Sequence, residues 1–194
     1  GKDLTGTILS GADLSNVILT GTILTGADLS DANLSGVDLS GRDITKMKLT
    51  GADLSNVILT GTTLTGADLS KTNLTGFDLS GMDLTEMKLT GADLSNAVLT
   101  ETIMAGADLR RTNLSDVDLS GWDLTGTILS SADLTNSVLP SDYLSLNDFT
   151  STVFDGVDLS GKDLTGSVFQ YASFKNANLQ NANLSAASFL QVDF

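Results

Sequence analysis

The sequence predicts an all-β fold, a parallel β-solenoid with about twenty residues per coil, and two regularities predict it. First, every fifth residue from Leu4 to Phe194 is a large apolar side chain, without one slip in register. This series has thirty-nine members, of which thirty-one are Leu. Second, the sequence repeats at forty residues, and residues 11–50 match residues 51–90 at 32 of 40 positions.

A period of five excludes ordinary secondary structure. On an α-helix, positions five apart precess by roughly 140°, so they form no stripe. On a strand, they alternate between the two faces. We therefore expect each unit to be one short extended side followed by a corner, with the central apolar residue pointing inward. Four such sides close a square coil of about twenty residues, and stacked coils pair in parallel about 4.8 Å apart.

The residues around each central Leu fit this geometry, as residues 12–16 and 27–31 illustrate. A small residue stands two before the Leu, a polar residue directly before it, and Ser or Thr directly after it. Two after the Leu, Gly is frequent, and Asn or Asp also occurs there. Gly, Asn and Asp suit a corner because they tolerate its backbone angles.

These units resemble the A(D/N)LXX motif of the pentapeptide repeat proteins, and the resemblance covers the whole chain. It implies a right-handed quadrilateral β-helix in which the central residue and the small residue two before it point inward. With about twenty residues per coil, the chain then makes nearly ten coils and a rod roughly 46 Å long.

One domain is expected over residues 1–194, because a solenoid grows in one dimension. Three sections are distinguished. Residues 1–138 carry the regular two-coil repeats, residues 139–155 are less regular and hold the only proline, Pro140, and residues 156–194 are enriched in Phe.

Composition argues against catalysis. The chain has no His and no Cys, which removes the commonest general base and the commonest metal ligands. Its Asp pairs arise from the repeat, and a regular rod offers no pocket to tune a carboxylate. We expect no catalytic residue, no metal and no cofactor. Calcium binding by an Asp column is disfavoured, because the alternation of Asp with other residues lowers the density of ligands.

The net charge of −14 argues against direct binding to nucleic acid or to anionic lipid. No apolar run approaches the eighteen or so residues of a membrane span, and the given chain shows no signal peptide. We expect a soluble protein, and the sequence does not indicate its compartment.

The residue before each central residue defines four columns, which we name sides 1 to 4. Side 1 reads Asp13, Asn33, Asp53, Asn73, Asp93, Asn113, Asp133. Side 2 reads Ile18, Asp38, Ile58, Asp78, Val98, Asp118, Val138, Asp158. Side 3 reads Asp3, Ile23, Asp43, Thr63, Asp83, Ile103, Asp123, Tyr143, Asp163. Side 4 reads Ile8, Asp28, Lys48, Asp68, Lys88, Asp108, Ile128, Asp148.

No Asp follows an Asp within a column. Stacked carboxylates would repel by roughly 1 kcal/mol in water, so the forty-residue period is interpreted as electrostatic design for stability. On side 1, Asn could also hydrogen-bond to carboxylates above and below. Duplication of a two-coil segment would produce the same period, and the two explanations are compatible.

The apolar residues on sides 2 and 3 are a candidate protein-contact surface, since a row of exposed branched side chains suits docking. The alternative is that β-branched residues simply favour an extended backbone. The candidate residues are Ile18, Ile23, Ile58, Val98, Ile103, Val138 and Tyr143.

An atypical column breaks the small-residue rule two before the central residue, at intervals of forty. It consists of Lys2, Arg42, Met82, Trp122 and Lys162. Because an unpaired buried cation is costly, we expect this column to tilt outward at a corner. A structural role and a binding role both stay open for it. Phe189 and Phe194 are expected to form an exposed end that stacks on another end or another chain.

The sequence therefore favours a non-catalytic structural or protein-interaction scaffold, an acidic rigid rod with a protein partner or self-association through its ends or its apolar side. The family resemblance implies one alternative, a DNA mimic that binds a type II topoisomerase. A third possibility is ice binding by the column Thr5, Thr25, Thr45, Thr65 and Thr85, but neighbouring Asp residues disfavour it.

Overall fold

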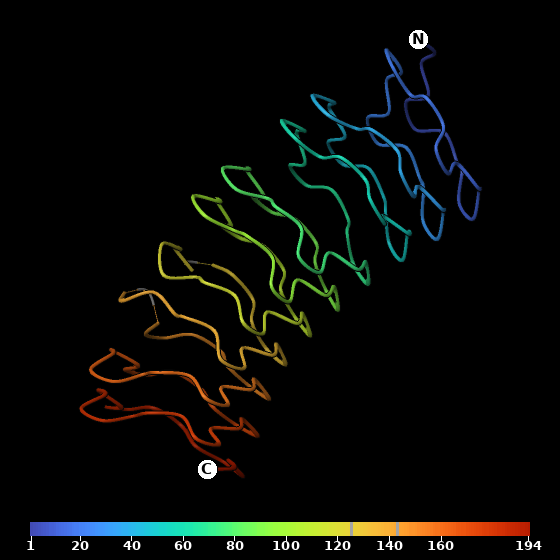
Figure 1. Cartoon of the computed structure of the whole chain (residues 1–194). Helices are drawn as coiled ribbons and strands as arrows, with labels where there is room; N and C mark the ends of the chain where they lie inside the picture. Colours follow the sequence, from blue (N-terminus) through green and yellow to red (C-terminus); the bar gives the residue numbers. More distant parts are fainter. Residues whose placement is uncertain (125, 143) are drawn as a thin grey trace.

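The chain winds into stacked coils that form an elongated rod with the two termini at opposite ends (Figure 1). The structure is a computed structural model that describes residues 1–124, 126–142 and 144–194. Over these ranges it has no helix and no continuous strand. Instead, the sides pair through isolated parallel bridges between residues twenty apart, such as Asp13 with Asn33 and Asp28 with Lys48. This offset confirms the prediction that each coil takes twenty residues.

Each bridge repeats the same hydrogen bonds. The Leu14 N–H donates to the Asn33 carbonyl at 2.8 Å, and the Asn33 N–H donates to the Ala12 carbonyl at 2.9 Å. At the preceding corner, the Ala12 N–H donates to the Leu9 carbonyl at 3.1 Å and closes a turn. Short extended sides and tight turns thus alternate along the chain.

The corner residue two after the centre has a positive φ at every unit from Gly6 to Gln191 except Gly121 and Ser141. This left-handed conformation is required at the third residue of a type II turn and suits Gly or Asn. Nineteen of these corners nevertheless carry other residues than Gly, including Leu146 at φ 59°. The prediction of demanding corners is confirmed, but the composition there is broader than Gly, Asn and Asp.

The polar residue before each centre clamps the corner that follows. The Asp3 carboxylate accepts the Thr5 N–H at 2.9 Å and the Thr5 hydroxyl at 2.6 Å. Among the described residues, the N–H at this position makes no backbone bond to a neighbouring coil, and the carboxylate satisfies it locally in an Asx turn. The Asn33 side-chain oxygen accepts the Ser35 N–H at 2.9 Å in the same way, so this bond lies within its own turn rather than between coils. This clamp explains why Asp or Asn precedes Leu and Ser or Thr follows it.

The core holds the central residues together with the residues two before them. Leu34 and Ala32 illustrate the two inward positions, and both are buried. Met47 and Met87 are also fully buried, where small residues were expected. Several buried hydroxyls at the small position donate to carbonyls, as the Thr112 Oγ1 does to the Leu89 carbonyl at 2.8 Å, whereas the buried Ser137 hydroxyl has no partner.

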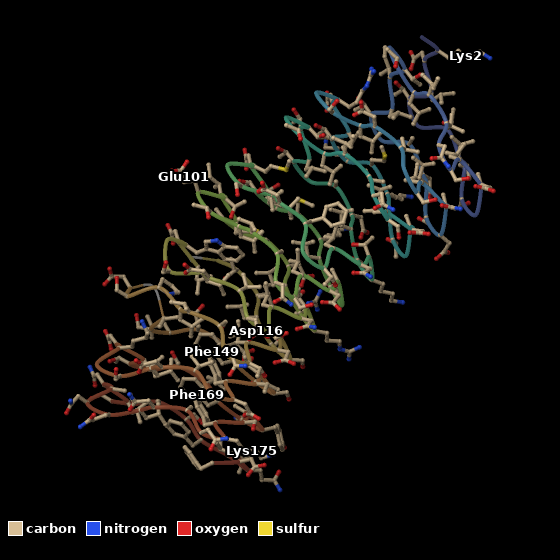
Figure 2. All side chains as sticks on the ribbon, viewed as in Figure 1. Lys2, Glu101, Asp116, Phe149, Phe169 and Lys175 are labelled. Atoms are coloured by element: carbon tan, nitrogen blue, oxygen red, sulfur yellow. The ribbon has the colours of Figure 1, made fainter. Side chains whose placement is uncertain are left out.

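Phenylalanine replaces leucine in the last coils and forms two ring stacks. One stack runs through Phe149, Phe169 and Phe189, with centroids 5.4 and 5.1 Å apart. Figure 2 shows the first two of these rings among the C-terminal coils. The second stack runs through residues 154, 174 and 194, with centroids 5.0 and 5.6 Å apart. Between the two stacks, Phe149 with Phe154 and Phe169 with Phe174 meet edge to face, as aromatic rings prefer, and the pairs that include Phe189 are tilted.

Candidate interaction surface

The branched residues of sides 2 and 3 lie on the surface of the rod. Ile18 is the most exposed of them, with 85% of its surface accessible. The others are between 48% and 56% exposed: Ile23, Ile58, Val98, Ile103 and Val138. Tyr143, the remaining candidate, lies outside the described residues. The predicted exposure is therefore confirmed for the six described members.

Carboxylates separate these apolar side chains. Side 2 alternates Asp38 with Ile58 and Asp78 with Val98, and each pair is joined by a bridge. Hydroxyl and N–H donation from Ser40 lowers the pKa of Asp38, and Ser80 lowers the pKa of Asp78 in the same way. These groups stay ionised at neutral pH, so the surface is at once apolar and negatively charged.

Side 4 has a different character because cations stand between its carboxylates. Lys48 Nζ lies 3.3 Å from the Asp28 carboxylate, as the alternation of charges predicts. Arg110 forms an ion pair with Asp108, two residues before it, with Arg110 Nη2 2.6 Å from Asp108 Oδ2. No Lys or Arg precedes a central residue on side 2 or side 3. Side 1 also lacks a cation at this position, so uncompensated carboxylates lie on sides 1, 2 and 3, and sides 2 and 3 combine them with exposed Ile and Val residues.

The ladder between coils opens at every second step on sides 2 and 3. Bridges on side 2 join 38 to 58, 78 to 98, and 118 to 138. Among the described residues, no bridge joins 18 to 38, 58 to 78, 98 to 118, or 138 to 158. Side 3 behaves alike, with bridges from 43 to 63 and 83 to 103 but none from 23 to 43 or 63 to 83. On these two sides, the coils stack as closed pairs separated by open fissures.

Bulky inward residues accompany the fissures. The coil above each fissure carries a large side chain two before its side 3 centre, namely Arg42, Met82, Trp122 or Lys162, whereas on side 2 only Phe77 is large and the other such coils carry Val. On side 1 the same position holds Ala or Thr in every coil except the last, which has Val192, and the ladder there lacks only the step from 53 to 73. On side 4, Met47 and Met87 are also large and fully buried, yet the steps from 28 to 48 and from 68 to 88 are closed, so the size of one side chain does not open the ladder by itself. The forty-residue period is thus a period of packing as well as of charge.

The atypical column points inward, which corrects the expectation of an outward tilt. Met82 is 8% and Trp122 is 3% exposed. Lys162 is half-buried and its ammonium donates to the Leu139 and Pro140 carbonyls at 3.1 and 2.9 Å. The Arg42 Nε is buried without a partner, and only Lys2 is exposed. The expectation failed because backbone carbonyls of the coil below offer partners that the sequence does not reveal.

Trp122 reaches across its fissure. Its indole Nε1 donates to the Leu99 carbonyl at 3.3 Å, which lies one coil and one corner below. Lys162 makes the corresponding contact with the Leu139 carbonyl. In these two fissures, the bulky residue supplies a donor that ties the open coils together.

Several exposed apolar residues were missed from the sequence. Ile8 begins side 4 and is exposed, as are Leu146 and Tyr171, which occupy left-handed corners. The signal for the last two was available, because the position two after the centre always lies at a corner. At the C-terminal end, Phe194 is 70% and Phe189 is 37% exposed.

Within the described ranges, no group of three or more His, Cys, Asp or Glu residues could hold a metal ion. No helix in these ranges is long and apolar enough to cross a membrane.

The repeats define the family. The sequence profile named Pentapeptide repeats matches in 8 copies, over residues 3–36, 38–76, 78–116, 103–139 and 148–185. The chain belongs to the pentapeptide repeat family. Proteins of this family form right-handed quadrilateral β-helices, and the present chain has the corresponding coil. Comparison with curated proteins gives no match.

Solved structures of the same family are similar to this chain. One is HetL, a pentapeptide repeat protein involved in heterocyst differentiation regulation, from the cyanobacterium Nostoc sp. strain PCC 7120. It is 29% identical to this chain, with a TM-score of 0.47, and the match covers 96% of this chain and 86% of HetL. QnrB1, a plasmid-mediated fluoroquinolone resistance protein, is 15% identical with a TM-score of 0.42, covering 94% and 91%. A pentapeptide repeat protein from the Arabidopsis thaliana thylakoid lumen is 33% identical with a TM-score of 0.21, covering 57% and 70%.

Proposed function

We propose that this chain is a non-catalytic protein-interaction scaffold, a single acidic rod of nearly ten coils over residues 1–194. Its contact surface is the face made by sides 2 and 3, which we name the acidic-apolar face. The regular coil, which places each unit in the same orientation, supports a role in presenting side chains at fixed spacing.

One observation carries this proposal. The exposed apolar members of side 2 recur every forty residues and alternate with ionised carboxylates, while side 4 pairs its carboxylates with cations. Exposed branched side chains gain free energy when a partner covers them. Carboxylates between them select the partner by charge and orient it. A partner that recognises one pair of coils meets the same pattern again at the next pair.

Site-specific photo-crosslinking tests the proposal. A photoreactive residue is placed at Ile58 or Val98 on the face, or at Lys88 on side 4 as the matched control, since all three stand directly before a central residue. We expect discrete protein adducts from the two face positions, lost when Val138→Lys is added, and none from Lys88. Equal adducts from the control position would refute the acidic-apolar face.

The apolar end offers a second contact for self-association. The rings of Phe189 and Phe194 are partly exposed and extend the two aromatic stacks. Light scattering over a range of concentrations tests this contact. We expect a concentration-dependent dimer that Phe194→Asp weakens, and a monomer at all concentrations would refute it.

Mimicry of DNA toward a type II topoisomerase is the second candidate, favoured by the net charge of −14 on a rod. The alternation of Asp with Ile or Val on sides 2 and 3 dilutes the likeness to a row of phosphates. A supercoiling assay with gyrase separates the two candidates: inhibition at low micromolar protein would support mimicry, and none at tens of micromolar would dismiss it.

A further inference from the structure

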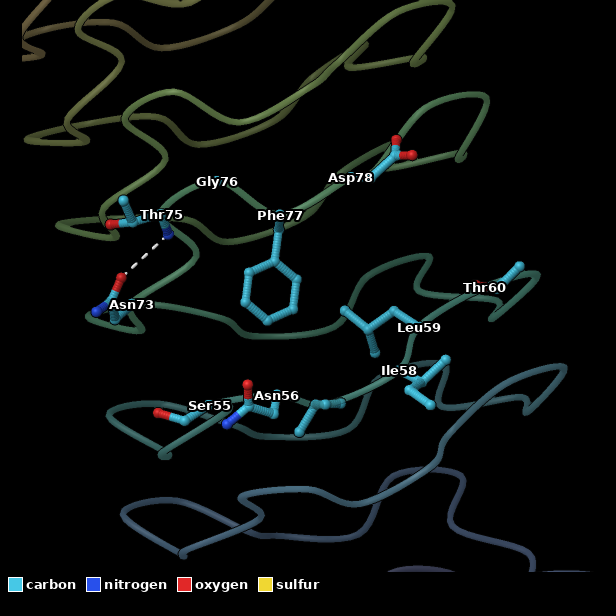
Figure 3. A pocket seen from close by; sticks show the side chains of 11 residues that line it. Ser55, Asn56, Ile58, Leu59, Thr60, Asn73, Thr75, Gly76, Phe77 and Asp78 are labelled. Carbon is cyan, nitrogen blue, oxygen red and sulfur yellow. Dashed lines mark hydrogen bonds between the residues drawn. The ribbon is translucent and has the colours of Figure 1, made fainter.

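One fissure of the rod lies between residues 54–64 and residues 73–83, and we name it the central fissure. A groove of about 630 Å³ opens there, lined by residues 55–60 and by residues 73 and 75–78. Figure 3 shows the Phe77 ring hanging from the upper coil into this space, opposite Ile58 and Leu59. Here the ladder fails on three sides, since the bridges from 53 to 73, 58 to 78 and 63 to 83 are all missing.

Both walls of the central fissure present unpaired backbone. On the lower wall, the Leu59 N–H and the Val57 carbonyl have no hydrogen-bond partner, although the equivalent groups of closed coils bond upward. On the upper wall, the N–H and the carbonyl of Asp78 are also without partners. Two facing edges of this kind are a template for an added extended segment.

One inserted segment could satisfy both walls. In a parallel ladder, the carbonyl of one inserted residue would accept the Leu59 N–H, and the N–H of the same residue would donate to the Val57 carbonyl. The residue after it would donate its N–H to the Asp78 carbonyl, and the residue before it would accept the Asp78 N–H. This reproduces the bonds that join Leu39 to Ile58 in a closed pair, at 2.9 Å. About five extended residues span the side.

The chemistry of the walls specifies the side chains. An inserted segment would alternate inward and outward side chains. Its two inward residues would meet Phe77, Val57 and Leu59, so they must be apolar. Its outward residue would stand between Ile58 and Asp78, where a long aliphatic stem with a cationic head fits best.

The chain itself contains this arrangement. On side 4, Met47-Lys48-Leu49 places two apolar residues inward and a lysine outward, with Lys48 Nζ 3.3 Å from the carboxylate of the neighbouring coil. The central fissure has the walls for such a segment but no segment of this chain within it.

Two other fissures are already tied by their own residues, and the fissure between residues 18–23 and 38–43 keeps its side 1 bridge from 13 to 33. Trp122 donates across one fissure and Lys162 across another, whereas Phe77 and Met82 have no donor to offer. The groove beside Trp122 is also smaller, about 210 Å³. The central fissure is therefore the one best suited to an external strand.

We propose that the central fissure binds an extended peptide segment of a partner protein, with the pattern apolar–Lys/Arg–apolar, as an added parallel strand. This inference rests on the proposed interaction function and names the chemistry of the partner.

An NMR titration with a synthetic peptide tests the proposal. The probe is the capped hexapeptide TKMKLT, which copies residues 45–50. The control is TKMDLT, which replaces the outward lysine by an acid. We expect TKMKLT to shift the amide signals of Leu59, Gly61 and Asp78 and to slow their hydrogen exchange, and TKMDLT to bind at least roughly tenfold more weakly.

Two variants sharpen the test. Phe77→Val removes the ring that lines the groove and installs the residue found at positions 37, 117 and 157, where the side 2 ladder is also open, so binding should weaken through lost apolar contact. Asp78→Asn should weaken binding, whereas Asp118→Asn, at the equivalent position beside Trp122, should leave it unchanged. Binding of both peptides alike, or shifts spread over every acidic side without slower exchange, would overturn the proposal. The crosslinking result at Ile58 and Val98 would then still decide the proposed function separately.

Discussion

At the scale of the residue, two devices make the five-residue unit. The residue before the centre clamps the N–H two positions on, as Asp3 does for Thr5. The residue two after the centre adopts a positive φ and lets the chain turn. Both features depend only on residues within one unit, so each unit determines its own corner. Neighbouring coils contribute the backbone hydrogen bonds of the ladder.

A substitution at a left-handed corner tests the second device. Gly161 has φ +67°, its N–H donates to the Gln180 carbonyl at 2.9 Å, and a Cβ there would meet nothing within 4 Å. Gly161→Ala should therefore cost about 1 kcal/mol through backbone conformation alone. Gly161→Asn should cost less, because Asn tolerates this region. Urea unfolding measures both, and equal free energies of unfolding for Ala and Gly would contradict the account.

At the scale of the element, pairs of coils are the packing unit on sides 2 and 3. The sequence was sufficient to predict the four columns, the twenty-residue offset and the exposure of Ile58 and Val98, because these follow from a strict register. It was not sufficient to predict the fissures, since they depend on how Phe77 and Trp122 pack between coils. The inward position of Lys162 also escaped prediction, because its carbonyl partners lie twenty-two and twenty-three residues away.

The aromatic stacks should stabilise the last coils strongly. Phe169 is fully buried and its ring contacts four other Phe rings. Phe169→Ala should lower the free energy of unfolding by about 3–5 kcal/mol through lost burial and a cavity. Phe169→Leu restores the residue typical of the other coils and should cost much less. Thermal unfolding followed by circular dichroism measures both, and similar losses would show that ring stacking, rather than volume, dominates.

At the scale of the whole molecule, charge and fold are coupled through the Asp clamps. Hydroxyl and N–H donors at the corners lower the pKa of Asp3, Asp53 and Asp163, among others, below the ordinary value of 3.8. A carboxyl whose pKa is lower in the folded state contributes stability that is present above 3.8 and is lost as the pH falls through the folded value. Repetition multiplies this contribution, while the net charge of −14 acts in the opposite direction through repulsion.

We therefore expect the melting temperature to fall as the pH decreases from about 4 to about 2, because the clamps lose their acceptors. Asp53→Asn serves as the matched control, since Asn33 shows that an amide oxygen also accepts the corner N–H. This variant should melt close to the parent at neutral pH and lose slightly less on acidification. A melting temperature that rises on acidification would mean that relief of repulsion outweighs the clamps.

The central claim is that the rod consists of coils paired in parallel at twenty residues, closed within each pair and open between pairs on sides 2 and 3. Amide hydrogen exchange of the chain alone tests it most directly. The amides of Leu39, Leu79 and Leu119 donate to carbonyls of the next coil at 2.8–2.9 Å, whereas those of Leu19, Leu59 and Leu99 have no acceptor. We predict that the first three exchange at least roughly tenfold more slowly than the second three. Equal protection of all six amides would contradict the open fissures.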